Sequence, residues 1–325
     1  MEGKQNIPKK GAILFTVNHP NALIDPLLVA TTNLRMQHFL VRAASFKNPT
    51  IKKLLGTLNL MPIYRIRDGV KELAKNEAIF NQCFSILQKG QALMIFPEGS
   101  HNIKRTVRPI SKGFTRIVFG AIDKYPDLKV TIIPVGITYQ NPSEYPTSVS
   151  IKYGKPIIAN DFYDAENIPA STLSLRNLVR NQLKEMIVHI PNDDQYHTVI
   201  SKLNNANVNY TDINGVNNMI GSNNIIQKKK KHLFLRPLKW LIILNSIIPW
   251  SIWKKIQKKV DEVEFVDTFR FGINAVSFPL FYGIQSWIIS SFFGWKIGMI
   301  YLITSIILIL FYSKVESIPP KSIPE

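Results

Sequence analysis

Two uncharged apolar stretches near the C-terminus constrain this chain most, because stretches of such length and hydropathy predict membrane-spanning helices. The first covers residues 273–295 and the second residues 297–313, with only Lys296 between them. Gly294 and Gly298 lie on either side of this lysine. The pattern predicts a transmembrane helical hairpin whose two ends lie on the same side of the bilayer. The alternative is a buried hairpin in the core of a soluble domain.

A basic segment precedes the expected hairpin. It begins with four consecutive lysines at residues 228–231, and it surrounds a mostly apolar stretch at residues 240–253 that is bounded by tryptophans and contains Pro249. This stretch is short for a span, so it predicts an interfacial or re-entrant helix, although the sequence leaves open whether it crosses the bilayer. The bias of positive charge toward the cytoplasm predicts a multi-pass membrane protein with its N-terminal domain on the cytoplasmic side.

The charge of the whole chain points to an anionic partner. There are 40 Lys and Arg against 22 Asp and Glu, a formal net charge of +18. Such a charge suits nucleic acid, a membrane surface or phosphorylated substrates. Because the basic residues concentrate beside apolar segments, without the interleaved aromatic side chains of a nucleic-acid module, we expect membrane lipids as partners and no nucleic acid.

The N-terminal part of the chain alternates short apolar runs with longer amphipathic ones, which indicates an α/β fold. We expect a domain over residues 1–203, an Asn-rich linker over 204–227 and a basic membrane-anchoring region over 228–325. The single cysteine, Cys83, excludes an internal disulfide framework and lies in an apolar helical pattern. The expected strands cover residues 12–17, 38–42, 60–64, 92–96, 129–134, 135–139 and 149–153, and the expected helices cover residues 23–31, 48–55, 70–87, 111–122, 171–190 and 195–203.

A histidine and a carboxylate follow the first expected strand. His19 comes two residues after the strand, and Asp25 follows six positions later. A histidine at the end of a buried strand lies where α/β folds bind their ligands, so His19 is a candidate general base. Asp25 is a candidate to orient the imidazole and to stabilise its protonated form. Taken alone the pair is weak evidence, because a His and an Asp at this spacing are common.

Two later strands also end in polar residues. The strand at residues 60–64 leads into Arg65 and Arg67, and an arginine there can hold a phosphate through two parallel hydrogen bonds, or merely pair with Asp68. The strand at residues 92–96 leads into Pro97-Glu98-Gly99-Ser100, in which Glu98 either binds a polyol hydroxyl or is simply solvated. The basic residues that follow, including Lys112 and Arg116, suit a phosphate or a nucleotide-bearing acyl donor.

In order along the chain, these blocks resemble those of the PlsC-like glycerolipid acyltransferase superfamily. The matching blocks are Asn18-His19 with a downstream aspartate, a strand ending in Arg65, the run Phe96-Pro97-Glu98-Gly99-Ser100, and Ile133-Pro134-Val135. The resemblance covers about residues 6–190. It implies a central mixed sheet flanked by helices, to which the C-terminal transmembrane region is added.

The resemblance also implies a reaction. A fatty acyl group would move from an acyl thioester, acyl-CoA or acyl-ACP, to a hydroxyl of glycerol 3-phosphate or 1-acylglycerol 3-phosphate. His19 would be the general base and Asp25 its partner, while Arg65, Glu98 and Gly99 would bind the glycerol phosphate. Because the thioester is already activated, we expect no cofactor or metal; acyl carrier protein is a further possible partner.

One departure from the family pattern concerns the catalytic pair. The family places four residues between its His and Asp, whereas five lie between His19 and Asp25. Two alternatives therefore stay open: an acyltransferase acting on dihydroxyacetone phosphate or another hydroxyl lipid, and a non-catalytic membrane protein that binds anionic lipid. The sequence does not specify the acceptor, the donor, the acyl-chain length or the oligomeric state.

Overall fold

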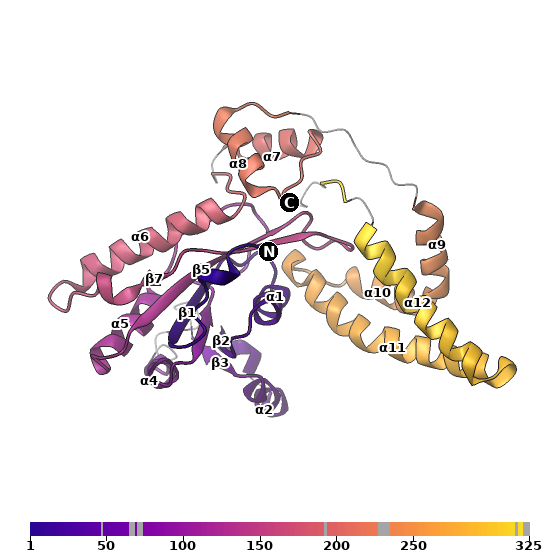
Figure 1. Ribbon diagram of the computed structural model, residues 1–325, viewed down its shortest axis with the longest axis horizontal. Helices are drawn as coiled ribbons and strands as arrows, with labels where there is room; N and C mark the ends of the chain where they lie inside the picture. Colours follow the sequence, from indigo (N-terminus) through magenta and orange to yellow (C-terminus); the bar gives the residue numbers. More distant parts are fainter. Residues whose placement is uncertain are drawn as a thin grey trace.

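A computed structural model describes residues 1–46, 48–64, 69, 74–191, 194–226, 235–315 and 318–320. Its N-terminal part is a seven-stranded sheet with helices on both faces, and its C-terminal helices form an arm at one side of the sheet (Figure 1). The strands are β1 (Ala12–Val17), β2 (Gln37–Arg42), β3 (Leu60–Ile63), β4 (Ala92–Ile95), β5 (Val130–Tyr139), β6 (Val149–Tyr153) and β7 (Ile157–Ile158).

The order of the sheet is β3-β2-β4-β1-β5-β6, and β7 also pairs with β5. Strands β1 to β5 run parallel to their neighbours, whereas β6 and β7 are antiparallel to β5. This mixed sheet flanked by helices confirms the fold predicted from the sequence. One long strand, β5, replaces the two short strands expected over residues 129–139, and β7 was not expected.

Helices cover the sheet because its strands are apolar on both faces. Every residue of β1 is buried, so two layers are needed to exclude water from it. Helices α4, α5 and α6 pack on one face through a cluster that contains Leu14, Leu93 and Ile132, while α1 packs on the other through Val29. The helices of this part are α1 (Ile24–Thr32), α2 (Pro49–Thr57), α4 (Asn76–Gln88), α5 (Gly113–Lys124) and α6 (Ile168–Met186).

The Asn-rich linker predicted after residue 203 is wrong for much of its length. Helix α7 (Tyr196–Asn205) is followed by a further helix, α8 (Ile213–Ser222), and both contribute to a separate apolar cluster that includes Tyr210 and Val216. The N-terminus of α8 is capped by Asp212, whose carboxylate accepts a hydrogen bond from the amide of Gly215. A few buried apolar residues and one cap are therefore enough to order this Asn-rich segment.

The arm consists of four helices: α9 (Arg236–Asn245), α10 (Ile247–Gln257), α11 (Val266–Phe293) and α12 (Trp295–Val315). The single helix predicted over residues 240–253 is therefore wrong, because the chain breaks at Ser246. Pro249 explains the break, since it has no N–H to bond the carbonyl of Asn245. The lysines at residues 228–231 lie outside the described residues.

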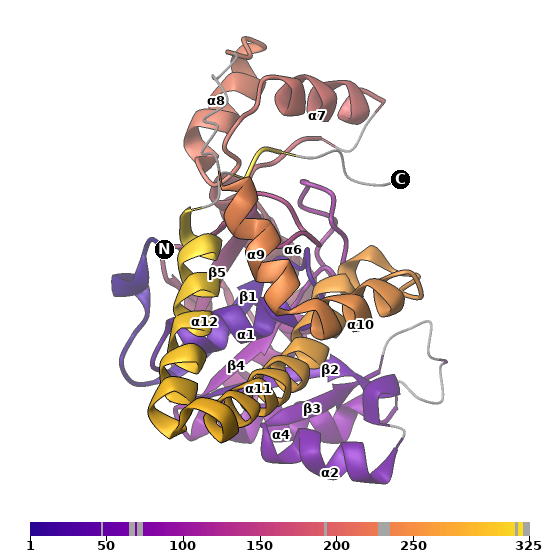
Figure 2. The same ribbon diagram turned by 90° about the vertical axis from the view of Figure 1, so that its right-hand side faces the viewer.

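Helices α11 and α12 form the hairpin predicted from the sequence. They pack side by side, and Gly294 makes the turn between them with a φ of +87° (Figure 2). Both are long and apolar enough to cross a membrane, and only 11% and 17% of their most apolar windows are buried. This exposure argues against a hairpin buried in the core of a soluble domain.

Candidate active site

The site forms where three neighbouring strands end. Strand β1 lies between β4 and β5, with Thr16 aligned with both Ile95 and Pro134. His19 follows β1 and Glu98 follows β4, so the two residues lie at the same edge of the sheet. This is the edge at which open parallel sheets bind ligands.

A hydrogen bond joins the two predicted catalytic residues. Nδ1 of His19 lies 2.9 Å from Oδ2 of Asp25, and the aspartate side chain is fully buried while that of His19 is 15% exposed. Asp25 also accepts hydrogen bonds from the backbone amide of Asn21 at 2.7 Å and from the hydroxyl of Tyr139 at 2.8 Å. With its Nδ1–H donated to Asp25, the imidazole keeps Nε2 as the acceptor for a substrate proton.

Burial decides the charge of His19. Desolvation, together with the positive charge of Arg108 and the proximity of His101, lowers the pKa of His19 from 6.5 to about 3. The ring of His19 stacks on that of Phe96 with 3.8 Å between centroids. The imidazole is therefore neutral near pH 7, which is the form that a general base requires.

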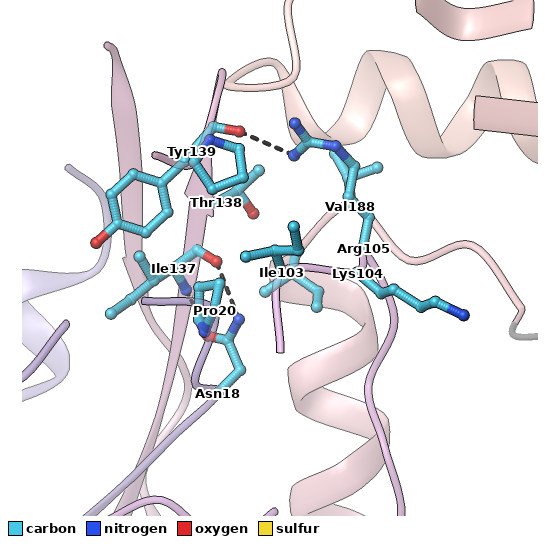
Figure 3. Close-up of a pocket in the computed structure, with 11 residues that line it drawn as sticks. Asn18, Pro20, Ile103, Lys104, Arg105, Ile137, Thr138, Tyr139 and Val188 are labelled. Atoms are coloured by element: carbon cyan, nitrogen blue, oxygen red, sulfur yellow. Dashed lines mark hydrogen bonds between the residues drawn. The ribbon is translucent and has the colours of Figure 1, made fainter. Parts of the chain in front are cut away.

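Asn18 fixes the loop that carries His19. Its side-chain amide donates to the carbonyl of Ile137 at 3.0 Å and accepts from the amide of the same residue at 2.7 Å. Figure 3 shows Asn18 beside Ile137 at the wall of a small cavity, which Ile103, Lys104 and Arg105 also line. The side chain of Asn18 thus continues the hydrogen bonding between β1 and β5 beyond the end of β1.

Glu98 is held by an arginine that follows it in the chain. Arg108 donates from Nε to Oε2 of Glu98 at 2.8 Å, and its other nitrogens bond Ser100. Gly99 makes the turn between Glu98 and Ser100 with a φ of +75°, a conformation that residues with a side chain rarely adopt. Burial raises the pKa of Glu98, and the Arg108 charge opposes this shift.

The other carboxylate oxygen of Glu98 has no partner among the residues that the structure describes. Oε1 is buried and accepts no hydrogen bond from the described residues. Such an orphaned acceptor costs free energy unless another donor reaches it. A hydroxyl of a bound ligand is one such donor.

The remaining predicted site residues fall into two groups. Arg65 and Arg67 lie outside the described residues. Lys112 lies exposed immediately before α5, whereas Arg116 points its guanidinium at the ring of Phe80, 5.0 Å away on α4.

The sequence did not identify three contributors to the site. Tyr139 reaches Asp25 from the end of β5, and no motif marks it. Arg108 stood among several basic residues after Glu98, with nothing to single it out. The third contributor is the segment of the C-terminal arm just before α11, where Glu262 lies 2.8 Å from the Nε2 atom of His101 and Phe265 contacts the same ring.

His101, Glu262 and Glu264 lie close enough together to hold a metal ion, with candidate ligand atoms within 4.8 Å of one another. The side chain of Glu262 is 63% exposed, and His101 already pairs with it. Proximity of this kind is common at protein surfaces, so the geometry alone assigns no metal.

Comparisons with known proteins point to one family. Residues 1–138 match the family model described as Acyltransferase. Glycerol-3-phosphate O-acyltransferase 1 of Saccharomyces cerevisiae is 29% identical over 79 residues, which are 24% of this chain and 10% of the relative. Glycerol-3-phosphate O-acyltransferase 2 of the same yeast is 27% identical over 126 residues, 38% of this chain and 17% of the relative. The matches therefore span less than a fifth of these yeast proteins.

A solved structure is also similar. The crystal structure of the 1-acyl-sn-glycerophosphate acyltransferase PlsC from Thermotoga maritima aligns with 56% of this chain and 68% of its own, at 21% identity and a TM-score of 0.40. The match is too distant to support an argument on its own. The family model and the yeast relatives are the stronger findings: residues 1–138 of this chain are similar to glycerolipid acyltransferases of the PlsC-like family.

Proposed function

We propose that the protein is a membrane-bound O-acyltransferase that moves a fatty acyl group from an acyl thioester to a hydroxyl of glycerol 3-phosphate or of its 1-acyl derivative. The observation that carries the proposal is the hydrogen bond between His19 and the buried Asp25 at the sheet edge. The names of the two yeast relatives make glycerol 3-phosphate the first acceptor to test.

The chemistry follows from the neutral imidazole. Nε2 of His19 takes the proton of the acceptor hydroxyl while its oxygen attacks the thioester carbonyl, and Asp25 stabilises the imidazolium that forms. The tetrahedral intermediate then collapses, its carbon–sulfur bond breaks, and the departing thiolate takes the proton from His19. The ester and a free thiol are the products, and no covalent enzyme intermediate is needed.

Acceptor binding is assigned to the residues that follow β4. Oε1 of Glu98, which has no partner among the described residues, is suited to accept a glycerol hydroxyl, and Gly99 makes the turn that follows it. Lys112 is an exposed cation that could bind a phosphate, and the role of Arg65 and Arg67 as phosphate ligands rests on the sequence alone.

The arm supports a location at the bilayer. Helix α12 has 21 residues and is therefore about 32 Å long, enough to cross a hydrocarbon core of roughly 30 Å. Exposed large side chains such as Trp287, Phe292 and Leu310 face outward from the hairpin. We place both hairpin ends and the catalytic domain on the cytoplasmic side, with Lys296 opposite, following the distribution of positive charge.

Helices α9 and α10 fit a re-entrant segment beside this hairpin. Helix α9 packs on α12 and α10 packs on α11. The polar break at Asn245 and Ser246 bonds Tyr301 and Tyr282 at 2.7 Å and 2.6 Å. Hydrogen bonds of this kind satisfy polar side chains that would otherwise be unpaired in lipid.

The test is thiol release from palmitoyl-CoA by the full chain in phospholipid vesicles. Glycerol 3-phosphate, 1-acylglycerol 3-phosphate and dihydroxyacetone phosphate serve as parallel acceptors, and an acyl-ACP donor is assayed beside the CoA ester. The expected result is release that depends on one acceptor and is lost in His19→Ala. The matched control is His197→Ala, because His197 lies on α7, away from the sheet edge.

Two outcomes would overturn parts of the proposal. Full activity in His19→Ala would refute His19 as the base. No thiol release with any donor and acceptor, from protein that still binds anionic vesicles, would favour the non-catalytic alternative. The five-residue gap between His19 and Asp25 is the only sequence feature in favour of that alternative, and the hydrogen bond between them supports the catalytic interpretation instead.

A further inference from the structure

The start of helix α11 contacts the loop that carries the catalytic histidine. Three consecutive residues of that loop, Asn21, Ala22 and Leu23, each donate a hydrogen bond to the segment of residues 264–268. The acceptors are the Asp267 carboxylate at 2.6 Å, the Glu264 carbonyl at 3.2 Å and the Thr268 hydroxyl at 3.1 Å. These contacts join parts of the chain about 240 residues apart.

Asn21 connects this contact to the catalytic pair. Its side chain donates to Asp267, while its backbone amide donates to the same oxygen of Asp25 that faces His19. Asn21 is 1% exposed, so Asp267 and not bulk water is the partner of its side-chain N–H. The position of its backbone therefore depends on Asp267, and the position of Asp25 depends in turn on that backbone.

Asp267 is itself fixed by charge and by a second loop. Its other oxygen lies 2.9 Å from Nη1 of Arg270, and both side chains are only 12% exposed. The backbone amide of Ser143 donates to Asp267 at 3.2 Å, and Arg270 donates to the carbonyl of Ser143 at 2.7 Å. The guanidinium of Arg270 also lies over the ring of Trp253 on α10. A closed set of partners thus holds the carboxylate in one place.

We propose that Asp267 is a positioning residue for catalysis: from the first turn of the candidate membrane span α11, it holds Asn21 and through it the His19–Asp25 pair. The catalytic role of this pair rests on the proposed function, whereas the positional role of Asp267 does not. The position of the arm against the domain therefore affects the geometry of the base, because Asp267 on the arm holds the loop that carries His19.

The loop can be observed without any assay of activity. Hydrogen exchange of the full chain in detergent micelles reports the amides of residues 21–23, all three of which donate in the structure. Asp267→Ala should speed their exchange by about tenfold or more, because a local opening becomes easier. Glu2→Gln is the matched control, since it removes a carboxylate from a surface ion pair with Lys152 and should leave these amides unchanged.

Asp267→Ala leaves Arg270 without its ion pair, so two milder substitutions accompany it. Asp267→Asn keeps the shape of the side chain and one acceptor oxygen. Thr268→Val removes the hydroxyl that accepts from Leu23, and Thr268→Ser restores it. We expect faster exchange in Thr268→Val and recovery in Thr268→Ser.

Kinetics then test the catalytic consequence. A displaced base lowers kcat, by about tenfold to a hundredfold in Asp267→Ala, while KM for donor and acceptor stays within about twofold. A variant that merely unfolds would lower the active fraction and raise exchange throughout the sheet. Unchanged exchange at residues 21–23 in Asp267→Ala would overturn the inference, whether or not the wild type transfers acyl groups. If exchange is faster in Asp267→Ala but the wild type is inactive, only the proposed function is overturned.

Discussion

The Nδ1 atom of His19 lies 2.9 Å from Oδ2 of Asp25, although five residues separate the two in the chain. The extra residue falls in the turn before helix α1, which begins at Ile24. Asp25 therefore lies in the first turn of the helix, and its carboxylate accepts a hydrogen bond from the amide of Asn21 as well as facing the imidazole. A turn can absorb one residue because the helix that follows it sets the direction of the side chain.

Asp25→Asn should lower kcat by about a hundredfold or more, with little change in KM. An amide has one acceptor oxygen where the carboxylate has two, and it cannot stabilise the imidazolium by charge. Tyr139→Phe is the matched comparison because it removes one donor to Asp25 but keeps the carboxyl group itself. Steady-state kinetics of both variants measure the difference, and equal losses in the two would contradict a role for the Asp25 charge.

As the pH is lowered, activity should fall only at a pH well below the ordinary pKa of histidine. The base must be unprotonated, so activity is full above the pKa of His19 and falls below it. Since burial lowers that pKa to about 3, kcat/KM should stay level from pH 7 down to about 5. Phe96→Ala uncovers the ring and should move the fall in activity back toward pH 6.5.

Folding stability changes in the same direction over this range. Between pH 6.5 and about 3 the unfolded chain binds a proton at His19 that the folded chain does not. Stability therefore falls as the pH is lowered through this window, and unfolding midpoints must be measured beside the rates. A fall in kcat/KM centred near pH 6.5 in stable wild-type protein would contradict a buried neutral base.

Glu98→Gln should raise KM for the acceptor by about tenfold while KM for the thioester changes little. The carboxylate accepts hydrogen bonds from Arg108 through one oxygen and leaves the other for a donor, and an amide presents only one acceptor. Arg108→Gln should weaken both acceptor binding and stability, because it leaves the buried Glu98 charge unpaired.

The control for these two variants is Lys124→Gln, which removes an exposed cation at the end of α5. Its kinetics and thermal midpoint should match those of the wild type. An unchanged acceptor KM in Glu98→Gln would refute the assignment of Glu98 to the acceptor.

Much of the sheet could be predicted because its strands are short, apolar and regularly spaced. Strands β1, β4 and β6 lie within one residue of their expected bounds, since alternation with helices defines an α/β fold well. The split predicted at Pro134 is wrong because Pro134 lies in a strand whose ladder tolerates one missing donor. Helix α8 was missed because asparagine content suggested a linker, whereas Ile213 and Val216 supply the burial that orders it.

The site residues that could be predicted from the sequence are those that come soon after the end of a strand. His19, Asp25 and Glu98 were chosen for that reason, and the structure brings the first two into contact. Tyr139 and Asp267 could not be chosen, because their roles come from contacts across more than 100 residues of chain. Sequence periodicity carries no information on which distant polar side chain meets another.

The packing of the hairpin predicts a sensitive glycine. A Cβ atom on Gly298 would lie 2.0 Å from Oγ of Ser290 and 2.6 Å from the carbonyl oxygen of Ser286, so α11 and α12 approach too closely there for a larger residue. Gly298→Val should separate the helices and lower the thermal midpoint in micelles. Gly283→Val is the control, because a Cβ at Gly283 meets no neighbour; equal effects of the two substitutions would argue against close packing at Gly298.

The arm yields a prediction about topology. Ser305, which accepts a hydrogen bond from Asn245, lies about 15 Å along α12 from its start at Trp295, near the middle of a core of roughly 30 Å. The break between α9 and α10 should therefore lie deep in the bilayer, with the basic ends of both helices at one surface. Single cysteines at Lys239, Lys258, Leu244 and Lys296 test this in sealed vesicles, in a background in which the buried Cys83 is replaced by alanine.

A membrane-impermeant maleimide, added to one side or the other, reports each position. Lys239→Cys and Lys258→Cys should label from the same side, Lys296→Cys from the opposite side, and Leu244→Cys from neither, because its exposed side chain would face lipid. Labelling of residues 239 and 258 from opposite sides would make the segment a true span. Labelling of residue 244 from the same side as residue 239 would instead place both helices on the membrane surface. The contacts of Asn245 with the hairpin would then not form in the bilayer.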